Sequence, residues 1–293
     1  MNILITGSTG FVGIGLLRHI EGSHTDDKIY LLSSRNNVNY ETTQYKYEEG
    51  HLKFEVPKNI DVLIHLGAWT PKSTAVANDV KGAFSNIQFT QELLNTLDSL
   101  KKIVFISTLD VYAPTKEPIS ENSLVRPISL YGSSKLYCED MVNAWVKERS
   151  ISCCILRLGH IYGVGELQYK KLIPILINQA LHNEPINIFS DGQEKRSFLN
   201  IENCVDVVWK AAHDDSTGLY NVVSGTPVCV AEIARMIKNL SASKSEINIL
   251  NKVTNTRDCV FDNTKLTNQF HIEEKPLKVG LMEEIEYFRS LIV

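Results

Sequence analysis

The stretch Asn2–Gly13, NILITGSTGFVG, decides how the chain begins. Its first five residues are an apolar run that predicts a short buried parallel strand. Three glycines follow at three-residue spacing: Gly7, Gly10 and Gly13. An apolar helical pattern begins at Phe11. A glycine turn between a strand and a helix brings phosphate oxygens to a helix N-terminus, so the stretch predicts dinucleotide binding. An ordinary strand–helix turn, which also favours glycine, is the alternative.

The composition is that of a water-soluble globular protein. The chain has 293 residues and a net charge of -4, which is enough length for one large domain or two. No basic block is present, so neither nucleic acid nor an anionic membrane is expected as a partner. The longest apolar run, Leu172–Ile177, is too short to span a bilayer and contains Pro174. The first residues show no signal-peptide pattern, and we expect a cytoplasmic protein.

Cysteine and histidine spacing gives no sign of a metal site. The six cysteines are Cys138, Cys153, Cys154, Cys204, Cys229 and Cys259. None forms a CxxC pair, and the eight histidines also lack ligand spacing. We therefore expect buried, reduced thiols and no metal.

Apolar periodicity predicts alternating strands and helices in the first half of the chain. Strands are expected over 2–6, 28–33, 61–66, 102–107 and 151–158, and helices over 11–21, 79–100 and 131–149. This alternation is typical of a Rossmann-type, doubly wound parallel α/β sheet. We expect this NAD(P)-binding domain over 1–160, with 202–225 returning to it. Shorter, mixed elements over 161–293 predict a smaller α/β substrate lobe.

The motif Tyr131-Gly-Ser-Ser-Lys135 is the most specific chemical signal. Residues four apart on a helix share a face, so the phenol and the ammonium can reach one site. A tyrosine of pKa about 10 is a poor acid or base at neutral pH, and a nearby ammonium moves that pKa toward the working range. Thr108, at the end of a predicted strand, would orient a carbonyl beside the phenol. A surface Tyr–Lys pair and ordinary strand-end chemistry are the alternatives.

Several motifs together resemble the extended short-chain dehydrogenases/reductases, and within them the nucleotide-sugar epimerase/dehydratase/reductase group. They are GSTGFVG, DVLIHLGA, FISTLDVY, YGSSK, RLGHIYG and the stretch 172–203, and they span nearly the whole chain. The resemblance implies that Thr108, Tyr131 and Lys135 are catalytic and that Asn86 supports them. It further implies that Arg196, joined by Arg257, binds the diphosphate of a sugar nucleotide. A surface salt bridge is the alternative for Arg196.

The resemblance and the motifs together give two sets of site residues. The cofactor set is Gly7, Thr9, Gly10, Phe11, Val12, Gly13, Ser33, Ser34, Arg35, Leu66, Gly67, Ala68, Asn86, Ser107, Tyr131 and Lys135. The substrate set is Trp69, Thr70, Thr108, Asp110, Lys171, Arg196 and Arg257.

The end of the second strand bears on the choice of cofactor. A carboxylate at this place holds the ribose 2′-hydroxyl of NAD. The chain has Ser33, Ser34 and Arg35 instead, which suit a 2′-phosphate. NADP(H) is therefore favoured, with NAD as the alternative.

Family patterns around the tyrosine narrow the reaction. The 4,6-dehydratases carry adjacent Asp and Glu after the threonine, where this chain has Leu109 and Asp110. The 3,5-epimerase/reductases use a cysteine and a histidine, whose places fall on Asp110 and Lys171. We therefore expect NADPH-dependent reduction of a nucleotide-activated 4-keto-6-deoxyhexose.

The main alternative is an NAD(P)-dependent nucleotide-sugar 4-epimerase. A reductase of small or steroidal carbonyls and a non-catalytic dinucleotide sensor are further alternatives. Family members dimerise through helices corresponding to 79–99 and 130–149, which predicts a homodimer.

Overall fold

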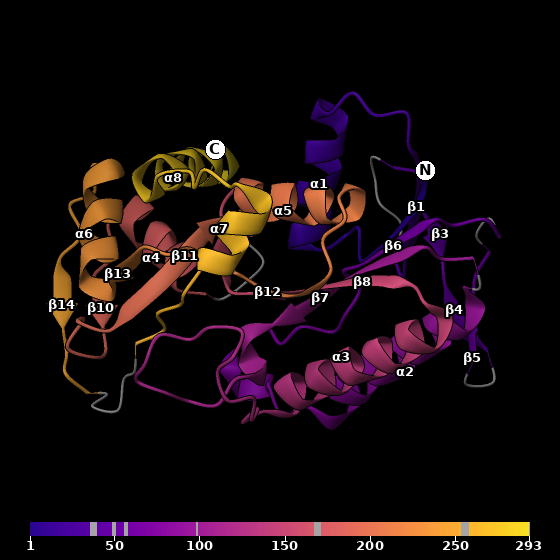
Figure 1. Ribbon diagram of the computed structural model, residues 1–293. Helices are drawn as coiled ribbons and strands as arrows, with labels where there is room; N and C mark the ends of the chain where they lie inside the picture. Colours follow the sequence, from indigo (N-terminus) through magenta and orange to yellow (C-terminus); the bar gives the residue numbers. More distant parts are fainter. Residues whose placement is uncertain are drawn as a thin grey trace. The chain divides into compact units, whose positions relative to one another are not determined.

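The chain folds into two compact units (Figure 1). The computed structural model describes residues 1–35, 40–48, 51–55, 58–97, 99–166, 171–252 and 258–292. The first unit comprises Met1–Ala113, Leu124–Leu158 and Cys204–Asn221. The second comprises Pro114–Ser123, Gly159–Asn203 and Val222–Val293.

A seven-stranded sheet forms the centre of the first unit. Its strands are β1 (Asn2–Thr6), β2 (Lys28–Ser33), β3 (Thr43–Gln44), β6 (Val62–His65), β7 (Lys102–Thr108), β8 (Ser152–Leu158) and β12 (Gly218–Val222). Their spatial order is β12-β8-β7-β6-β1-β2-β3, with parallel pairing from β3 through to β8. The predicted Rossmann-type parallel sheet is confirmed. The strand order changes direction between β1 and β6.

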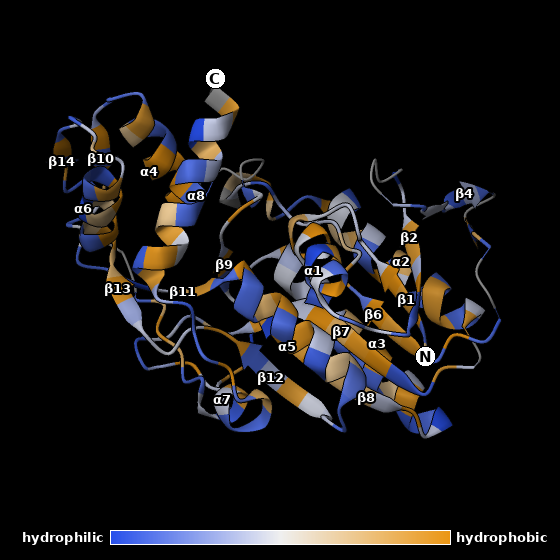
Figure 2. Cartoon of the chain, turned by 90° about the horizontal axis from the view of Figure 1, so that it is seen from above, coloured by the Kyte–Doolittle hydropathy of each residue, from blue (hydrophilic) through white to orange (hydrophobic). Residues whose placement is uncertain are grey.

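Helices cover both faces of this sheet. They are α1 (Phe11–Gly22), α2 (Val80–Thr96), α3 (Leu130–Arg149) and α5 (Ile201–His213). α2 and α3 lie side by side on one face, and α1 and α5 lie on the other (Figure 1). The strands between them are almost continuously apolar (Figure 2). A sheet that is buried on both faces requires this pattern.

Polar caps set where α2 and α3 begin. The Asp79 carboxylate accepts a hydrogen bond of 2.6 Å from the Gly82 N–H, and the Ser129 hydroxyl accepts one of 3.1 Å from the Gly132 N–H. Each cap pairs a backbone donor that the first turn of a helix leaves without a partner. The Ser129 cap thereby places Tyr131 in the first turn of α3.

The second unit contains smaller sheets and its own core. A three-stranded sheet has the order β13 (Pro227–Cys229), β11 (Lys195–Asn200) and β9 (His160–Tyr162), and β10 (Ile186–Ile188) pairs with β14 (Ile247–Ile249). Its helices are α4 (Leu172–Leu181), α6 (Val230–Leu240), α7 (Thr264–Phe270) and α8 (Leu277–Ile292). Ile177, Ile233 and Leu281 are fully buried between α4, α6 and α8.

Short elements are where the sequence-based prediction was incomplete. β9, β13 and α7 were not predicted, because three to seven residues carry too little periodicity. The segment between β2 and β6 contains the short strand β3 and, after it, β4 (Lys46–Glu48), which pairs with β5 (His51–Lys53). Short 3₁₀ helices occur at η1 (Thr74–Val76) and η2 (Leu109–Val111).

The cysteines are free thiols, and three of them are only half-buried: Cys153, Cys229 and Cys259. Within the described ranges, no cluster of three or more His, Cys, Asp or Glu residues could hold a metal ion. No helix in that part of the chain is long and apolar enough to cross a bilayer.

Candidate active site

The glycine turn after β1 has the geometry of a phosphate cradle. Gly7 has φ +74°, and a Cβ there would lie 2.7 Å from the backbone nitrogen of Gly67. The Gly10 N–H donates to the Gly7 carbonyl at 3.0 Å, and Gly10 is the N-cap of α1. Because a glycine cap brings no side-chain oxygen, it leaves room for an anion at the helix N-terminus. A Cβ at Gly13 would collide with the Gly7 carbonyl.

The turn lies at the point where the sheet changes direction. Thr6 at the end of β1 is in register with His65 at the end of β6. The two strands lead into Gly7 and into the segment 66–69 respectively. Open α/β sheets bind ligands outside the carboxyl ends of such neighbouring strands.

The end of β2 carries hydroxyls next to the glycine turn. Ser33 is buried, and its Oγ lies 3.1 Å from Thr9 Oγ1. The same Oγ accepts a hydrogen bond from the Arg35 N–H at 3.3 Å. Ser34 and Arg35 are exposed. The turn and the strand end are thus joined through two small hydroxyl side chains.

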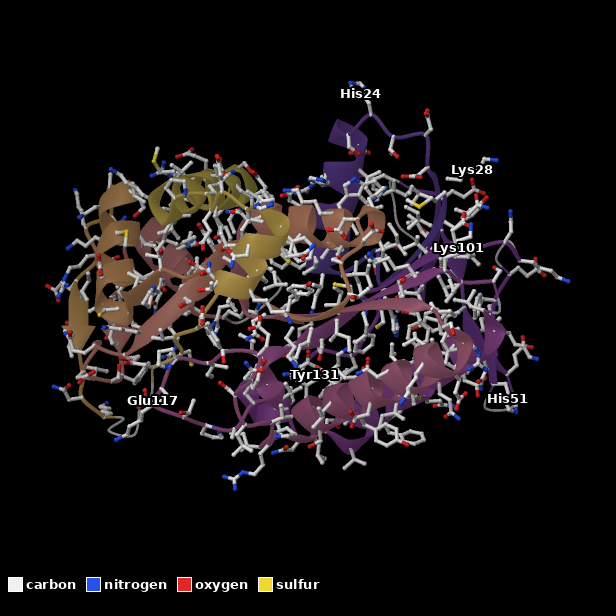
Figure 3. The ribbon with its side chains drawn as sticks, in the orientation of Figure 1. His24, Lys28, His51, Lys101, Glu117 and Tyr131 are labelled. Carbon is white, nitrogen blue, oxygen red and sulfur yellow. The ribbon has the colours of Figure 1, made fainter. Side chains whose placement is uncertain are left out.

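Tyr131 and Lys135 are both buried on one face of α3. Tyr131 lies at the beginning of the helix (Figure 3), with its ring edge-on to Trp69 at a centroid distance of 6.0 Å. Only 3% of Lys135 is exposed, and its Nζ lies 4.3 Å from the centre of the Phe105 ring. Burial lowers the pKa of Lys135 to about 8, against the opposing effects of Cys138 and Glu139. The pair is therefore not an ordinary surface pair.

Thr108 ends β7 close to the first turn of α3. Its Oγ1 accepts a hydrogen bond of 3.2 Å from the N–H of Asp110, which leaves the hydroxyl hydrogen to be donated elsewhere. Gly132 packs so closely against the Asp110 carbonyl that a Cβ on Gly132 would collide with it. The structure thus brings the segment after Thr108 against the turn that contains Tyr131. The side chain of Asp110 is exposed.

Asn86 joins the loop after β6 to α3. Its Oδ1 accepts from the Trp69 N–H at 2.7 Å, and its Nδ2 donates to the Trp69 carbonyl at 3.1 Å. The same Nδ2 lies 3.2 Å from Ser134 Oγ, which donates to the Tyr131 carbonyl at 2.8 Å. This geometry suits a supporting residue. Thr70, next to Trp69, is exposed.

The Ser107 hydroxyl donates to the Glu139 carboxylate, in the interior of the first unit. Glu139 also forms an ion pair with Arg157. Ser107 was expected to contact the cofactor. The hydrogen bond that the structure gives it is instead with Glu139 of this buried pair.

The expected basic substrate residues Lys171 and Arg196 belong to the second unit. Lys171 is the N-cap of α4, and its Nζ lies 3.0 Å from Glu166 Oε1. Arg196 lies in β11 and donates to the Lys195 carbonyl at 2.9 Å. Burial, together with the positive charges of Arg196 and Lys171, lowers the pKa of His160 to about 4. Both cations are therefore near His160. Arg257 lies outside the described residues.

The sequence-based prediction did not include three polar residues around Asn86, namely His65, Thr90 and Ser134. His65 lies between Thr6 and Thr90, with Nδ1 2.7 Å from Thr6 Oγ1 and Nε2 3.1 Å from Thr90 Oγ1. Ser134 connects Asn86 to Tyr131. A histidine inside an apolar strand, and a threonine one helical turn after Asn86, were the signals that could have identified two of them.

Curated relatives of this chain are nucleotide-sugar enzymes. The chain is 29% identical to the uncharacterized UDP-glucose epimerase YtcB of Bacillus subtilis, over 99% of both chains. It is 28% identical to a dTDP-D-glucose 4,6-dehydratase of Dictyostelium discoideum over 82% of this chain, and spans 62% of that protein's length. A trifunctional UDP-glucose 4,6-dehydratase/3,5-epimerase/reductase of Arabidopsis thaliana is 25% identical, and the chain spans 47% of it.

Solved structures of 4-epimerases have the same fold. The UDP-N-acetylglucosamine 4-epimerase of Methanobrevibacter ruminantium superposes with a TM-score of 0.85 at 22% identity, covering 99% of this chain and 98% of that one. The UDP-glucuronic acid 4-epimerase of Bacillus cereus, in complex with UDP-glucuronic acid and NAD, gives 0.80 at 25% identity, covering 99% and 100%.

The family model for the NAD dependent epimerase/dehydratase family matches residues 3–223. That range includes the glycine turn, Thr108, the Tyr131–Lys135 pair, Lys171 and Arg196. The chain therefore belongs to the NAD dependent epimerase/dehydratase family.

Proposed function

We propose that the chain is a nucleotide-sugar 4-epimerase that uses NAD(P). The observation that carries this proposal is the burial of Tyr131 and Lys135 on one face of α3, with the end of β7 packed against the same turn. A non-catalytic dinucleotide sensor would have no need for a buried lysine beside a tyrosine.

The glycine turn fits the pyrophosphate of a dinucleotide. A Cβ at Gly7 would fill the space next to Gly67, and Gly10 places no side chain over the N-terminus of α1. Thr9 and Ser33 are on the side of the turn next to β2, where the adenosine ribose would bind. Bound NAD(P) supplies reversible hydride transfer at its nicotinamide ring.

The chain's own residues would handle the proton. Tyr131 would accept the proton of the sugar 4-hydroxyl as the carbonyl forms and return it when the carbonyl is reduced from the other face. Lys135 would stabilise the phenolate through its positive charge. Thr108, whose oxygen already accepts from Asp110, would donate its hydrogen to the sugar oxygen.

The relatives support the epimerase better than the reductase that the sequence led us to expect. The relative that matches over the full length of both chains carries the name UDP-glucose epimerase, and several 4-epimerases share the fold. Dehydration would need an acid where this chain has the half-buried Leu109. Epimerisation needs only the tyrosine, the lysine, the threonine and a retained nicotinamide.

The second unit would hold the nucleotide diphosphate. Lys171 and Arg196 both act electrostatically on His160, so two cations are near one half-buried imidazole. Guanidinium and ammonium groups are the usual partners of phosphate oxygens. A nucleotide sugar therefore fits better than a small or steroidal carbonyl. The variant Arg196→Ala is expected to raise KM for the nucleotide sugar more than it changes kcat.

A second candidate is NADPH-dependent reduction of a nucleotide-activated 4-keto-6-deoxyhexose. The hydroxyls of Ser33 and Ser34 and the exposed Arg35 favour it, since they suit a 2′-phosphate. The variant Ser33→Asp tests this cofactor preference. It is expected to weaken NADP(H) binding by about tenfold or more while sparing NAD(H), because a carboxylate repels the 2′-phosphate. If Ser33→Asp weakened the binding of NADP(H) and NAD(H) equally, these residues would no longer support the reductase.

The test of the chemistry is Tyr131→Phe. The variant is expected to bind NAD(P) as the parent chain does and to lose at least about a hundredfold in sugar turnover, the typical contribution of a positioned acid–base group. Turnover at the parent rate would mean that Tyr131 is not the acid–base residue.

We also propose that the chain forms a homodimer through α2 and α3. Phe84 is 60% exposed and Tyr137 is 57% exposed. Tyr137, Met141 and Trp145 follow one face of α3 and line an open groove of about 410 Å³. Aromatic side chains of this size on neighbouring helices are typical of an interface.

A further inference from the structure

His65 is a buried histidine with a partner on each ring nitrogen. It is the last residue of β6, it is 2% exposed, and it lies between the rings of Phe89 and Phe105 at 5.4 and 5.5 Å. Its Nδ1 is 2.7 Å from Thr6 Oγ1, and its Nε2 is 3.1 Å from Thr90 Oγ1. A ring held in this way has no freedom to turn.

The neighbouring donors determine where its hydrogen lies. Thr90 donates its hydroxyl hydrogen to the Asn86 carbonyl at 2.8 Å, so its oxygen can only accept from His65. Nε2 therefore carries a hydrogen. Burial, with a smaller effect from the charge of Lys135, lowers the pKa of His65 to about 3, which keeps the ring neutral at physiological pH.

The neutral ring then accepts at Nδ1. Thr6 donates its hydroxyl hydrogen there, and its oxygen accepts from the Gly67 N–H at 2.9 Å. All four hydrogen bonds consequently point the same way, from Gly67 through Thr6, His65 and Thr90 to Asn86. We call this series the His65 chain.

The His65 chain joins the two halves of the candidate site. At one end, Thr6 directly precedes the glycine turn, and Gly67 packs against Gly7. At the other end, Asn86 holds both backbone groups of Trp69 and, through Ser134, the carbonyl of Tyr131. The His65 chain thus runs from the residue before the glycine turn to the residue that holds the backbone next to the phenol.

We propose that His65 is a positioning residue for the reaction at Tyr131, acting as the Nε2–H tautomer at the centre of the His65 chain. The proposal rests on the proposed function for its catalytic consequence. Its structural part, the tautomer and the direction of the hydrogen bonds, does not depend on that function. A rigid ring with a donor and an acceptor on separate edges suits this place, since each neighbour offers a single hydroxyl.

The tautomer is tested by nitrogen NMR on the full chain labelled with ¹⁵N-histidine and saturated with NAD(P). The variant His65→Gln identifies the resonances by their loss. We expect a protonated Nε2 and an unprotonated Nδ1 at neutral pH. A protonated Nδ1, or an imidazolium, would overturn the proposal whatever the enzyme's activity.

The positioning role is tested at Thr90. Thr90→Val keeps the shape of the side chain but removes its hydroxyl, whereas Thr90→Ser keeps the hydroxyl. We expect Thr90→Val to lower kcat by about tenfold or more, with the dissociation constant for NAD(P) changed less than about twofold, because small displacements at a reacting centre are costly. Thr90→Ser should restore most of kcat.

Thr96→Val is the matched control. Thr96 makes the same hydrogen bond to the carbonyl four residues earlier, but at the exposed end of α2. This variant should leave kcat unchanged. A Thr90→Val enzyme with lower thermal stability but the parent kcat would show a merely structural role and would overturn the positioning proposal.

The two proposals fail separately. If no nucleotide sugar is converted but the Nε2–H tautomer is found, the proposed function is contradicted and the His65 chain is supported. If sugars are converted and removal of the Thr90 hydroxyl leaves kcat unchanged, the proposed function is supported and the positioning role is contradicted.

Discussion

Glu139 of α3 and Arg157 of β8 form a bidentate ion pair in the interior of the first unit. Arg157 Nε lies 2.9 Å from Oε1, and Nη2 lies 2.6 Å from Oε2. Both side chains are at most 5% exposed, and the guanidinium stacks over the Tyr112 ring at 4.7 Å. Glu139 follows Lys135 by one helical turn, so the pair fixes the part of α3 that carries the candidate lysine.

Removing one partner of this pair leaves an uncompensated buried charge. Glu139→Ala is expected to lower the free energy of unfolding by about 3–5 kcal/mol. The double variant Glu139→Leu/Arg157→Met removes both charges and should be clearly more stable than Glu139→Ala. Glu148→Ala, on the exposed side of the same helix, is the control and should change stability by less than about 1 kcal/mol. If the single variants Glu139→Leu and Arg157→Met had effects that simply add up to that of the double variant in denaturant unfolding, the pairing would be contradicted.

Burial of Lys135 predicts a conflict between activity and stability. Its pKa in the folded protein is about 8, below its ordinary value of 10.5, because burial disfavours the charged form. Lys135→Met should abolish activity and stabilise the fold by about 1–3 kcal/mol below pH 8. The folded parent chain binds fewer protons than the unfolded one between pH 8 and 10.5, so its stability rises there and the advantage of the variant shrinks.

The exposed Lys147 on the same helix provides the control for this prediction. Lys147→Met should leave both activity and stability close to those of the parent chain. Chemical denaturation as a function of pH is the measurement. A Lys135→Met chain that is less stable than the parent at pH 7 would contradict the account.

The burial of Glu284 on α8 predicts that the second unit loses stability as the pH rises. It is fully buried, and burial, then the charge of Glu166, raises its pKa to about 9, although Lys171 opposes the shift. Between pH 4.5 and 9 the folded state therefore holds a proton that the unfolded state releases. Stability must fall as the pH rises through that range, by up to about 1.4 kcal/mol per pH unit from this group.

The variant Glu284→Gln should remove this slope and be more stable than the parent at pH 8. Glu232→Gln, an exposed change on α6, is the control and should keep the parent slope. If the free energy of unfolding of the parent and of Glu284→Gln changed with pH at the same slope, Glu284 would not titrate as described.

The proposed dimer predicts a change of mass with single exposed substitutions. The parent chain should sediment at twice its 33.0 kDa mass. Phe84→Glu and Tyr137→Glu should each shift it toward the monomer, because a carboxylate cannot be buried there without a partner. Phe189→Glu changes an equally exposed aromatic residue of the second unit and should have no effect. A parent chain that sediments as a monomer would remove the proposal.

The sequence predicted the sheet and proposed the candidate catalytic residues because both rest on short-range signals. Buried strands such as β1 and β7 are continuous apolar runs, and a glycine turn or a YxxxK pair lies within a few residues. The ion pair of Glu139 with Arg157 and the contacts of His65 with Thr6 and Thr90 join residues 18 to 59 positions apart. No local pattern specifies such partners, because they meet only after the strands are paired.

The distinction between epimerase and reductase lay beyond the sequence for a different reason. Both reactions use the same tyrosine, lysine and threonine, and they differ in whether the hydride returns to the sugar. Ser33 to Arg35 indicate a cofactor preference but not the fate of the hydride. The full-length resemblance to an epimerase therefore shifted the conclusion where the residues alone favoured reduction.

The fate of deuterium distinguishes 4-epimerisation from reduction and from dehydration. Nucleotide hexoses labelled with deuterium at C4 are incubated with the purified chain and catalytic NAD(P)⁺, and the products are resolved by NMR. UDP-glucose, UDP-N-acetylglucosamine and UDP-glucuronic acid form the first panel. For a 4-epimerase we expect the C4 epimer with deuterium still on C4 and no net consumption of cofactor. Deuterium transferred to C6, or no epimer from any sugar alongside stoichiometric oxidation of NADPH by a 4-keto sugar, would contradict it.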